Sequence, residues 1–141
     1  MTTAPEPAKI SPYLTVNGAS DAIALYQKVF GAKENARMMA QDGKRLMHAD
    51  LTINGGRVLL SDEFAEFDGG SAPLPDRKSP VSVAVSYDSP TEVDATFARA
   101  IEAGCKSELD PHDAFFGSRF AMLNDPFGHR WMLVAPLPQQ A

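Results

Sequence analysis

The sequence predicts an α+β fold built from two tandem modules, each with the order strand, helix, strand, strand, strand. Three observations support this prediction. Hydrophobic periodicity changes from that of a strand to that of a helix and back again in each half of the chain. The segment GGRVLL at 55–60 resembles GHRWML at 128–133 position by position. The glycines that end the two predicted helices, Gly31 and Gly104, keep the same offset from these segments, which indicates an internal duplication.

The composition limits the class of protein. The chain has 141 residues, of which 44% are hydrophobic and 22% charged, so it is long enough for one ordinary domain with a core. A formal net charge of -5 argues against general nucleic-acid binding, which requires a basic surface. The first residues lack the regions of a secretory signal, no apolar run suits a membrane span, and the single Cys105 excludes an intrachain disulfide. We therefore expect a cytoplasmic protein that binds neither nucleic acid nor membrane.

The first module is predicted between about residues 10 and 62, after a loose leader with two prolines. Its helix carries an apolar stripe and ends at Gly31. The turns between its last three strands contain Asp42-Gly43 and Asn54-Gly55. The predicted strand, helix and three strands are, in order, 10–16, 21–30, 34–40, 48–53 and 57–61.

Residues 62–79 contain glycines, prolines and charges without periodicity, which predicts a long linker or flap. The second module then covers about residues 80–136. Its helix has the clearest start signal, because Ser89 can cap it, Pro90 suits its first position and Glu92 completes a capping box. The predicted elements are a strand at 81–87, a helix from 90 to the stop at 104, a strand near 106–109, a loop at 110–118, and strands at 119–124 and 129–135.

The segment NDPFGHRWML at 124–133 is either a catalytic motif or a hairpin with a well-packed end. DPFG fits a type I turn with Asp125 first, Pro126 second and Gly128 last. We interpret it as a hairpin turn. His129 beside it is then a hydrogen-bonding or packing residue rather than a catalytic one.

Strand alternation divides the side chains between two faces. The predicted core face carries Leu14, Val16, Ala49, Leu51, Ile53, Val58, Leu60, Val81, Val83, Val85, Trp131 and Leu133. If the last turn pairs Asn124 with His129, then Phe120 and Met122 join this core. The opposite face then carries Ser11, Tyr13, Thr15, His48, Asp50, Thr52, Ser82, Ala84, Ser86, Arg119, Ala121, Leu123, Arg130, Met132 and Val134. That second face either meets solvent or curls into a cleft, and the duplication favours the cleft.

Three blocks of sequence, PYLTVNGASDAIALYQKVFGA, KRLMHADLTINGGRVLLSDE and FFGSRFAMLNDPFGHRWML, occur in this order. Together they resemble the PhnB-like branch of the vicinal oxygen chelate superfamily, which includes glyoxalase I, extradiol dioxygenases and bleomycin-resistance proteins. The resemblance covers about residues 10–135. It implies a single domain with a sharply curved, eight-stranded mixed sheet around a cleft, helices on the outer face and, usually, a homodimer.

The resemblance also bears on metal binding. In the metal enzymes of the superfamily, the ligands project into the cleft from equivalent strands of both modules. By strand position these places fall at or near Ser11, Asp50, Ser82 and Met132. Only Asp50 is a good ligand for a divalent ion, and His48 on the same face could be a second. We therefore expect no metal and no other cofactor.

We predict that a small-molecule ligand binds in the cleft, and the candidate residues are Tyr13, His48, Asp50, Ser82, Phe116, Arg119 and Met132. Two of them admit different roles. His48 and Asp50 share a strand face and are either a cavity-lining polar pair, a ligand-binding pair, or a general base with its carboxylate neighbour.

Two further candidates also admit alternatives. Arg119 either offers forked donors to a carboxylate or phosphate, or forms a surface salt bridge with Asp110 or Asp113. Phe115 and Phe116 lie in a loop and form either a lid over the ligand or part of a dimer interface.

Three function classes remain open at this point. The leading one is a small-molecule-binding protein of unidentified activity that lacks the usual metal site. The second is a metal-dependent lyase or dioxygenase-type enzyme acting on a small oxygenated substrate, and the third is a drug-sequestering resistance protein. Open sheet edges favour a homodimer, and the long linker would allow exchange of modules between chains.

Overall fold

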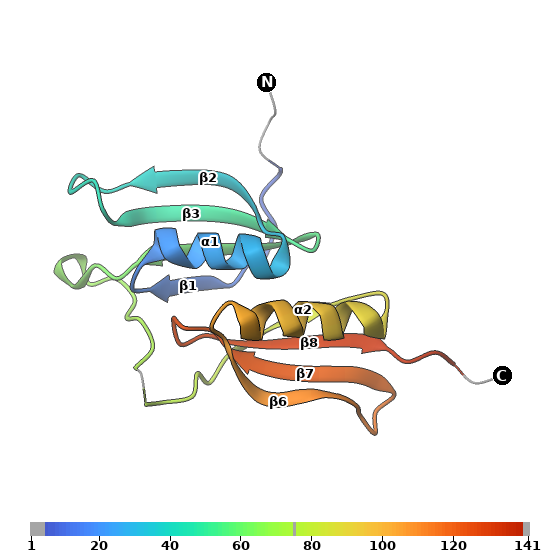
Figure 1. The fold of residues 1–141 in the computed structure, drawn as a ribbon. Helices are drawn as coiled ribbons and strands as arrows, with labels where there is room; N and C mark the ends of the chain where they lie inside the picture. The colour runs from blue at the N-terminus through green and yellow to red at the C-terminus, as the bar shows by residue number, and fades with distance from the viewer. Residues whose placement is uncertain (1–4, 75, 140–141) are drawn as a thin grey trace. The chain divides into compact units, whose positions relative to one another are not determined.

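The computed structural model describes residues 5–74 and 76–139 of the chain. It divides into two compact units, Met1–Pro75 and Asp76–Ala141, called module one and module two below. Within the described residues each module contains one α-helix and one four-stranded mixed sheet, and the helix packs against the sheet of its own module (Figure 1). The predicted α+β arrangement of tandem modules is thus confirmed. The strands form two sheets of four rather than the single eight-stranded sheet that the resemblance implies.

Module one has the strand order β1-β4-β3-β2, with β1 parallel to β4 and the other neighbours antiparallel. The first strand is shorter than predicted, because it begins at Tyr13 rather than at Ile10. A short 3-10 helix, η1, lies in the segment predicted as a linker. The elements are β1 Tyr13–Val16, α1 Ala19–Phe30, β2 Lys33–Met39, β3 Leu46–Ile53, β4 Gly56–Asp62 and η1 Ala65–Phe67.

Module two repeats this topology with the strand order β5-β8-β7-β6. The predicted loop at 110–118 is largely strand, because His112 pairs with Phe120 and Asp113 pairs with Arg119 across the ladder. The expectation of an early loop after Leu109 was therefore wrong. The elements are β5 Ser82–Ser86, α2 Pro90–Glu102, β6 Lys106–Asp113, β7 Ser118–Asn124 and β8 Arg130–Pro136.

The helix termini follow the sequence signals. Gly31 ends α1 in the left-handed conformation with φ 66°, which suits glycine because it has no Cβ atom. Ser89 and Glu92 form the predicted capping box of α2, and Pro90 occupies its first turn. The buried faces are Ala19, Ala22, Ile23, Tyr26 and Val29 in α1, and Val93, Thr96 and Ala100 in α2. Ile101 of α2 is 40% exposed and lies outside this buried face.

A buried carboxylate from β4 fixes the start of α1. Oδ1 of Asp62 accepts hydrogen bonds from the backbone N–H groups of Gly18 at 2.8 Å and Ala19 at 2.9 Å, and Oδ2 accepts one from Leu46 at 2.7 Å. Since no side chain caps α1 locally, Asp62 satisfies amides that the first helical turn leaves open. Asp62, predicted at the boundary between module one and the linker, is the last residue of β4.

The face of each sheet that packs on its helix is the core face, and we call the opposite face the distal face. The core faces carry the buried side chains of β3, β4 and β8 predicted from alternation, including Trp131, which is fully buried. Val81 departs from this pattern, because it precedes β5 and is 65% exposed. No helix among residues 5–74 and 76–139 is long and apolar enough to cross a membrane.

The register of β7 and β8 corrects one strand phase. Asn124 pairs with Arg130 rather than His129, so Leu123 lies beside Trp131 in the core. The expectation that Phe120 and Met122 lie in the core was wrong, as was the distal placement of Ala121, Leu123 and Arg119. The reason is the turn: the N–H of His129 donates to the Asp125 carboxylate, which keeps His129 out of the strand.

Candidate ligand-binding faces

Three predicted site residues lie together on the distal face of module one. Tyr13 of β1 pairs with Leu59 of β4, which in turn pairs with Asp50 of β3. The Tyr13 hydroxyl lies 2.9 Å from Nδ1 of His48, and their rings are 5.6 Å apart. Tyr13 is exposed and His48 half-buried. The hydrogen-bond partner of His48 is therefore Tyr13 rather than Asp50, and this pair can bind a polar group or exchange a proton with it.

Asp50 is instead held by an arginine. Nε and Nη2 of Arg57 donate to its two oxygens at 2.5 and 2.7 Å, and the amide of Asn35 donates at 3.2 Å. These hydrogen bonds, above all those from Arg57, hold the pKa of Asp50 below its ordinary value. Both side chains of the ion pair are largely buried, with 8% of Arg57 and 17% of Asp50 exposed.

The remaining donors of Arg57 tie down the N-terminal segment. Nη1 donates to the carbonyl of Glu6, and Nη2 donates to that of Pro5 at 3.2 Å. Residues 5 and 6, expected as part of a loose leader, thus contact the sheet of module one. Each of the three guanidinium nitrogens of Arg57 therefore donates at least one hydrogen bond, to Asp50 or to a backbone carbonyl.

The positions that the resemblance suggests for metal ligands do not suit a divalent ion. The only carboxylate among them, Asp50, is already neutralised by Arg57 through both oxygens. Ser11, Ser82 and Met132 offer hydroxyls and a thioether, which are weak or soft donors. Across residues 5–74 and 76–139, no three His, Cys, Asp or Glu side chains are grouped so that they could hold a metal. The residues present therefore do not fit the family's metal.

The second strand of each module contains a one-residue bulge at the same place. The ladder passes from Glu34 to Ala36 in β2, leaving Asn35 unpaired, and from Ser107 to Leu109 in β6, leaving Glu108 unpaired. A bulge redirects the extra side chain. In each module this side chain belongs to a network that contains the arginine at the start of β4 or β8.

In module two this network contains Glu108 and the predicted residue Ser82. Nε of Arg130 donates to the Ser82 hydroxyl at 2.6 Å, and Nη1 lies 3.5 Å from Glu108. Lys78 also pairs with Glu108 at 3.0 Å. The Lys78 ammonium and then the Arg130 guanidinium hold the pKa of Glu108 below its ordinary value.

The other predicted residues of module two separate into two groups. Met132 lies on the distal face between its cross-strand neighbours Ala84 and Met122. Phe116 lies in the β6–β7 turn, is 53% exposed, and contacts Phe120 edge-to-face with a centroid distance of 5.5 Å. Phe116 therefore borders the distal face.

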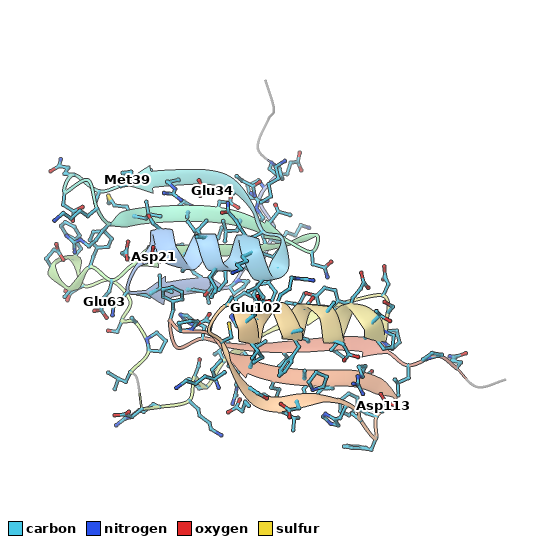
Figure 2. All side chains as sticks on the ribbon, viewed as in Figure 1. Asp21, Glu34, Met39, Glu63, Glu102 and Asp113 are labelled. Atoms are coloured by element: carbon cyan, nitrogen blue, oxygen red, sulfur yellow. The ribbon has the colours of Figure 1, made fainter. Side chains whose placement is uncertain are left out.

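Arg119 does not lie on the distal face. It shares the core side of β7, where Nε donates to Asp94 of α2 at 3.0 Å and Nη1 donates to Asp113 at 3.1 Å. Asp113 marks the end of β6 next to the hairpin in Figure 2. The alternative of a salt bridge with Asp113 is thus confirmed, while Asp110 accepts from Ser107 instead. Arg57 and Arg130 lie on the distal faces instead. Arg130 was expected there from strand alternation, whereas Arg57 was not, and the signal that could have found it was its place in GGR, which matches that of Arg130 in GHR.

Comparisons with known proteins agree with this fold. A sequence model of the Glyoxalase/Bleomycin resistance protein/Dioxygenase superfamily matches residues 9–133. The uncharacterized proteins Mb0911c of Mycobacterium bovis and Rv0887c of Mycobacterium tuberculosis are each 40% identical over 134 residues, covering 94% of this chain and 85% and 76% of those proteins.

Solved structures show the same architecture. Protein PA1353 from Pseudomonas aeruginosa is 23% identical with a TM-score of 0.75, and the match covers 94% of this chain and 100% of that one. A PhnB protein from Bacillus cereus is 20% identical with a TM-score of 0.72, covering 93% of this chain and 100% of that one. The chain belongs to the Glyoxalase/Bleomycin resistance protein/Dioxygenase superfamily.

Proposed function

We propose that the chain binds a small organic molecule through its distal-face residues and does so without a divalent metal. The residues proposed to form the ligand-binding faces are Tyr13, His48 and Asp50 in module one, and Ser82, Phe116 and Met132 in module two. Sequestration of a drug would be one form of this function. Arg119 is left out, because Asp94 and Asp113 hold it on the core side of β7.

The ion pair between Asp50 and Arg57 carries the proposal. A carboxylate that ligates a metal must present an oxygen to the ion, whereas both oxygens of Asp50 accept hydrogen bonds from one guanidinium. Arg57 thus supplies internally the positive charge that a metal would otherwise supply at this place. The exposed Tyr13 hydroxyl and the half-buried His48 ring remain for a ligand.

The test combines metal analysis with a ligand screen. Protein purified without chelators is expected to contain well below one equivalent of zinc, nickel, iron or manganese. A thermal-shift screen of small molecules, run with and without EDTA, is expected to give hits whose midpoint shifts do not depend on the chelator. Stoichiometric metal, or hits that EDTA abolishes, would contradict the proposal and favour a metal-dependent enzyme.

We further propose a cytoplasmic homodimer. The location is supported by cysteine usage, because the single Cys105 is a free, buried thiol and the chain carries no pair of cysteines for an intrachain disulfide. The dimer is supported by the edge strand β2, where Met38 and Met39 are 56% and 44% exposed. Exposed apolar side chains on a sheet edge favour pairing with another chain.

A further inference from the structure

The distal face of module two has a charged end and an aromatic end. Register places Ser82, Arg130 and Asn124 in one row across β5, β8 and β7, and two residues further Ala84, Met132 and Met122 form a second row. A third row contains Ser86, Val134 and Phe120. Because a strand rises about 3.3 Å per residue, the first and third rows are roughly 13 Å apart.

The corresponding face of module one is polar. In module one, Leu59 of β4 has Asp50 as its neighbour on one side and Tyr13 on the other. In module two, Met132 of β8 has Met122 and Ala84 at the matching places. The two modules share one topology, so these are matching places in the duplicated unit. Two polar side chains of module one thus correspond to apolar ones in module two. The ligand surface of module two is therefore suited to an apolar group.

The aromatic end consists of rings in edge-to-face contact. Phe120 lies 5.5 Å from Phe116 and 6.2 Å from His112, and Phe116 lies 5.4 Å from the exposed Phe115, measured between centroids. Such arrangements extend readily to a further aromatic ring, because the edge of one ring attracts the face of the next. The neighbouring thioethers of Met122 and Met132 adapt their shape to a flat ring.

At the charged end, Arg130 makes fewer hydrogen bonds than Arg57, the arginine at the matching place in module one. Arg57 donates two short hydrogen bonds to Asp50 and further ones to two carbonyls. Arg130 makes one short hydrogen bond, to the Ser82 hydroxyl, and its contact with Glu108 is 3.5 Å long. Lys78 shares that carboxylate, so two cations face one anion and the cluster carries a net positive charge.

We propose that module two binds a small aromatic carboxylate. The carboxylate accepts hydrogen bonds from the Arg130 guanidinium and from the Ser82 hydroxyl, whose proton is available because its oxygen accepts from Arg130. The ring system lies over Met132 and Met122 and reaches Phe120 and Phe116. The distance between the rows suits two fused or linked rings. This inference rests on the proposed small-molecule binding and names its ligand class.

The experiment titrates the purified chain with naphthalene-2-carboxylate and, separately, with the uncharged naphthalene-2-carboxamide in a calorimeter. The acid is expected to bind at least tenfold more tightly than the amide. Arg130→Gln is expected to remove this preference, and Arg130→Lys to restore part of it. Phe116→Ala should weaken both ligands alike. Arg119→Gln is the matched control, since this arginine lies on the core side, and it should leave both affinities unchanged.

The outcomes separate this inference from the proposed function. Equal affinities for acid and amide, a preference that survives Arg130→Gln in a folded variant, or no binding of either compound would overturn the aromatic-carboxylate assignment. Small-molecule binding itself would then be judged by the thermal-shift screen, which covers compounds with and without a charge. Near-ultraviolet circular dichroism of each variant, which reports on Trp131, establishes that it is folded. If Arg130→Gln unfolds, Ser82→Ala replaces it and must reduce the preference.

Discussion

Nε1 of Trp131 donates a hydrogen bond of 2.9 Å to Oδ2 of Asp125, and both side chains are buried. The other carboxylate oxygen accepts from the backbone N–H groups of Phe127 at 2.9 Å and His129 at 3.0 Å. One carboxylate thus joins the β7–β8 turn to the largest side chain of the core. The DPFG segment is a structural turn, as predicted, and its Asp125 side chain also accepts a hydrogen bond from a core residue.

Replacing Trp131 with alanine should lower the free energy of unfolding by about 3–5 kcal/mol, the usual cost of truncating a large core aromatic. Urea unfolding followed by far-ultraviolet circular dichroism measures this loss. The native fluorescence of the wild type, which has one tryptophan, should be blue-shifted. An emission maximum typical of water would contradict the burial of Trp131.

Asp125→Ala should lower the free energy of unfolding by more than the loss of so small a side chain would suggest. The substitution removes the acceptor of the Trp131 indole and of two backbone amides, and an unsatisfied buried donor costs about 1–3 kcal/mol. Asp125→Asn keeps one acceptor oxygen and should cost less. Asp113→Ala, in an exposed acid of the same module, is the control and should change the unfolding midpoint little. Equal midpoints for Asp125→Ala and the control would refute the role given to Asp125.

The same turn explains where prediction from the sequence succeeded and where it failed. The β3–β4 turn is short, so alternation placed His48 and Asp50 on the correct face. In the β7–β8 turn the Asp125 carboxylate holds the N–H of His129, and the strand begins one residue later than expected. Because side chains alternate, that single residue moved Phe120 and Met122 to the distal face and Arg119 to the core side.

Other parts of the site could not be predicted from sequence patterns. The bulges that release Asn35 and Glu108 depend on the register between strands, which a single sequence does not show. The partner of Asp50 is seven residues away across a hairpin, and the contact appears only when Thr52 pairs with Arg57. Helix caps such as Ser89 and Glu92 were predictable because all their interactions are local.

The ion pair of Asp50 should make stability depend on pH in the acid range. Its pKa is lower in the folded protein than in the unfolded chain, where the ordinary value is about 3.9. The unfolded chain therefore takes up the proton first, and the stabilisation is complete above that value and lost as the pH falls through the folded value below it. Thermal midpoints measured from pH 6 down to pH 3 should fall less steeply for Asp50→Asn than for the wild type. Parallel curves would show that Asp50 is not held by Arg57 in solution.

The proposed dimer makes a prediction about mass. Light scattering at micromolar concentration should give twice the chain mass of 15.2 kDa, because β2 presents apolar side chains on the outer strand of its sheet. Met39 lies at the end of this strand (Figure 2). A wild type with the mass of one chain would contradict the dimer.

The role of the β2 edge in the dimer can be tested by placing charged residues on it. Met38→Glu combined with Met39→Glu places two carboxylates on β2, and two copies that meet there would bring four such charges together without partners, which disfavours association. The double variant should therefore elute and scatter as a monomer. Its thermal unfolding midpoint should remain that of a folded chain. Met47→Glu is the matched control, since Met47 is similarly exposed but belongs to β3, an inner strand. If the double variant stays dimeric, the chains associate through another surface and the β2 edge is not their interface.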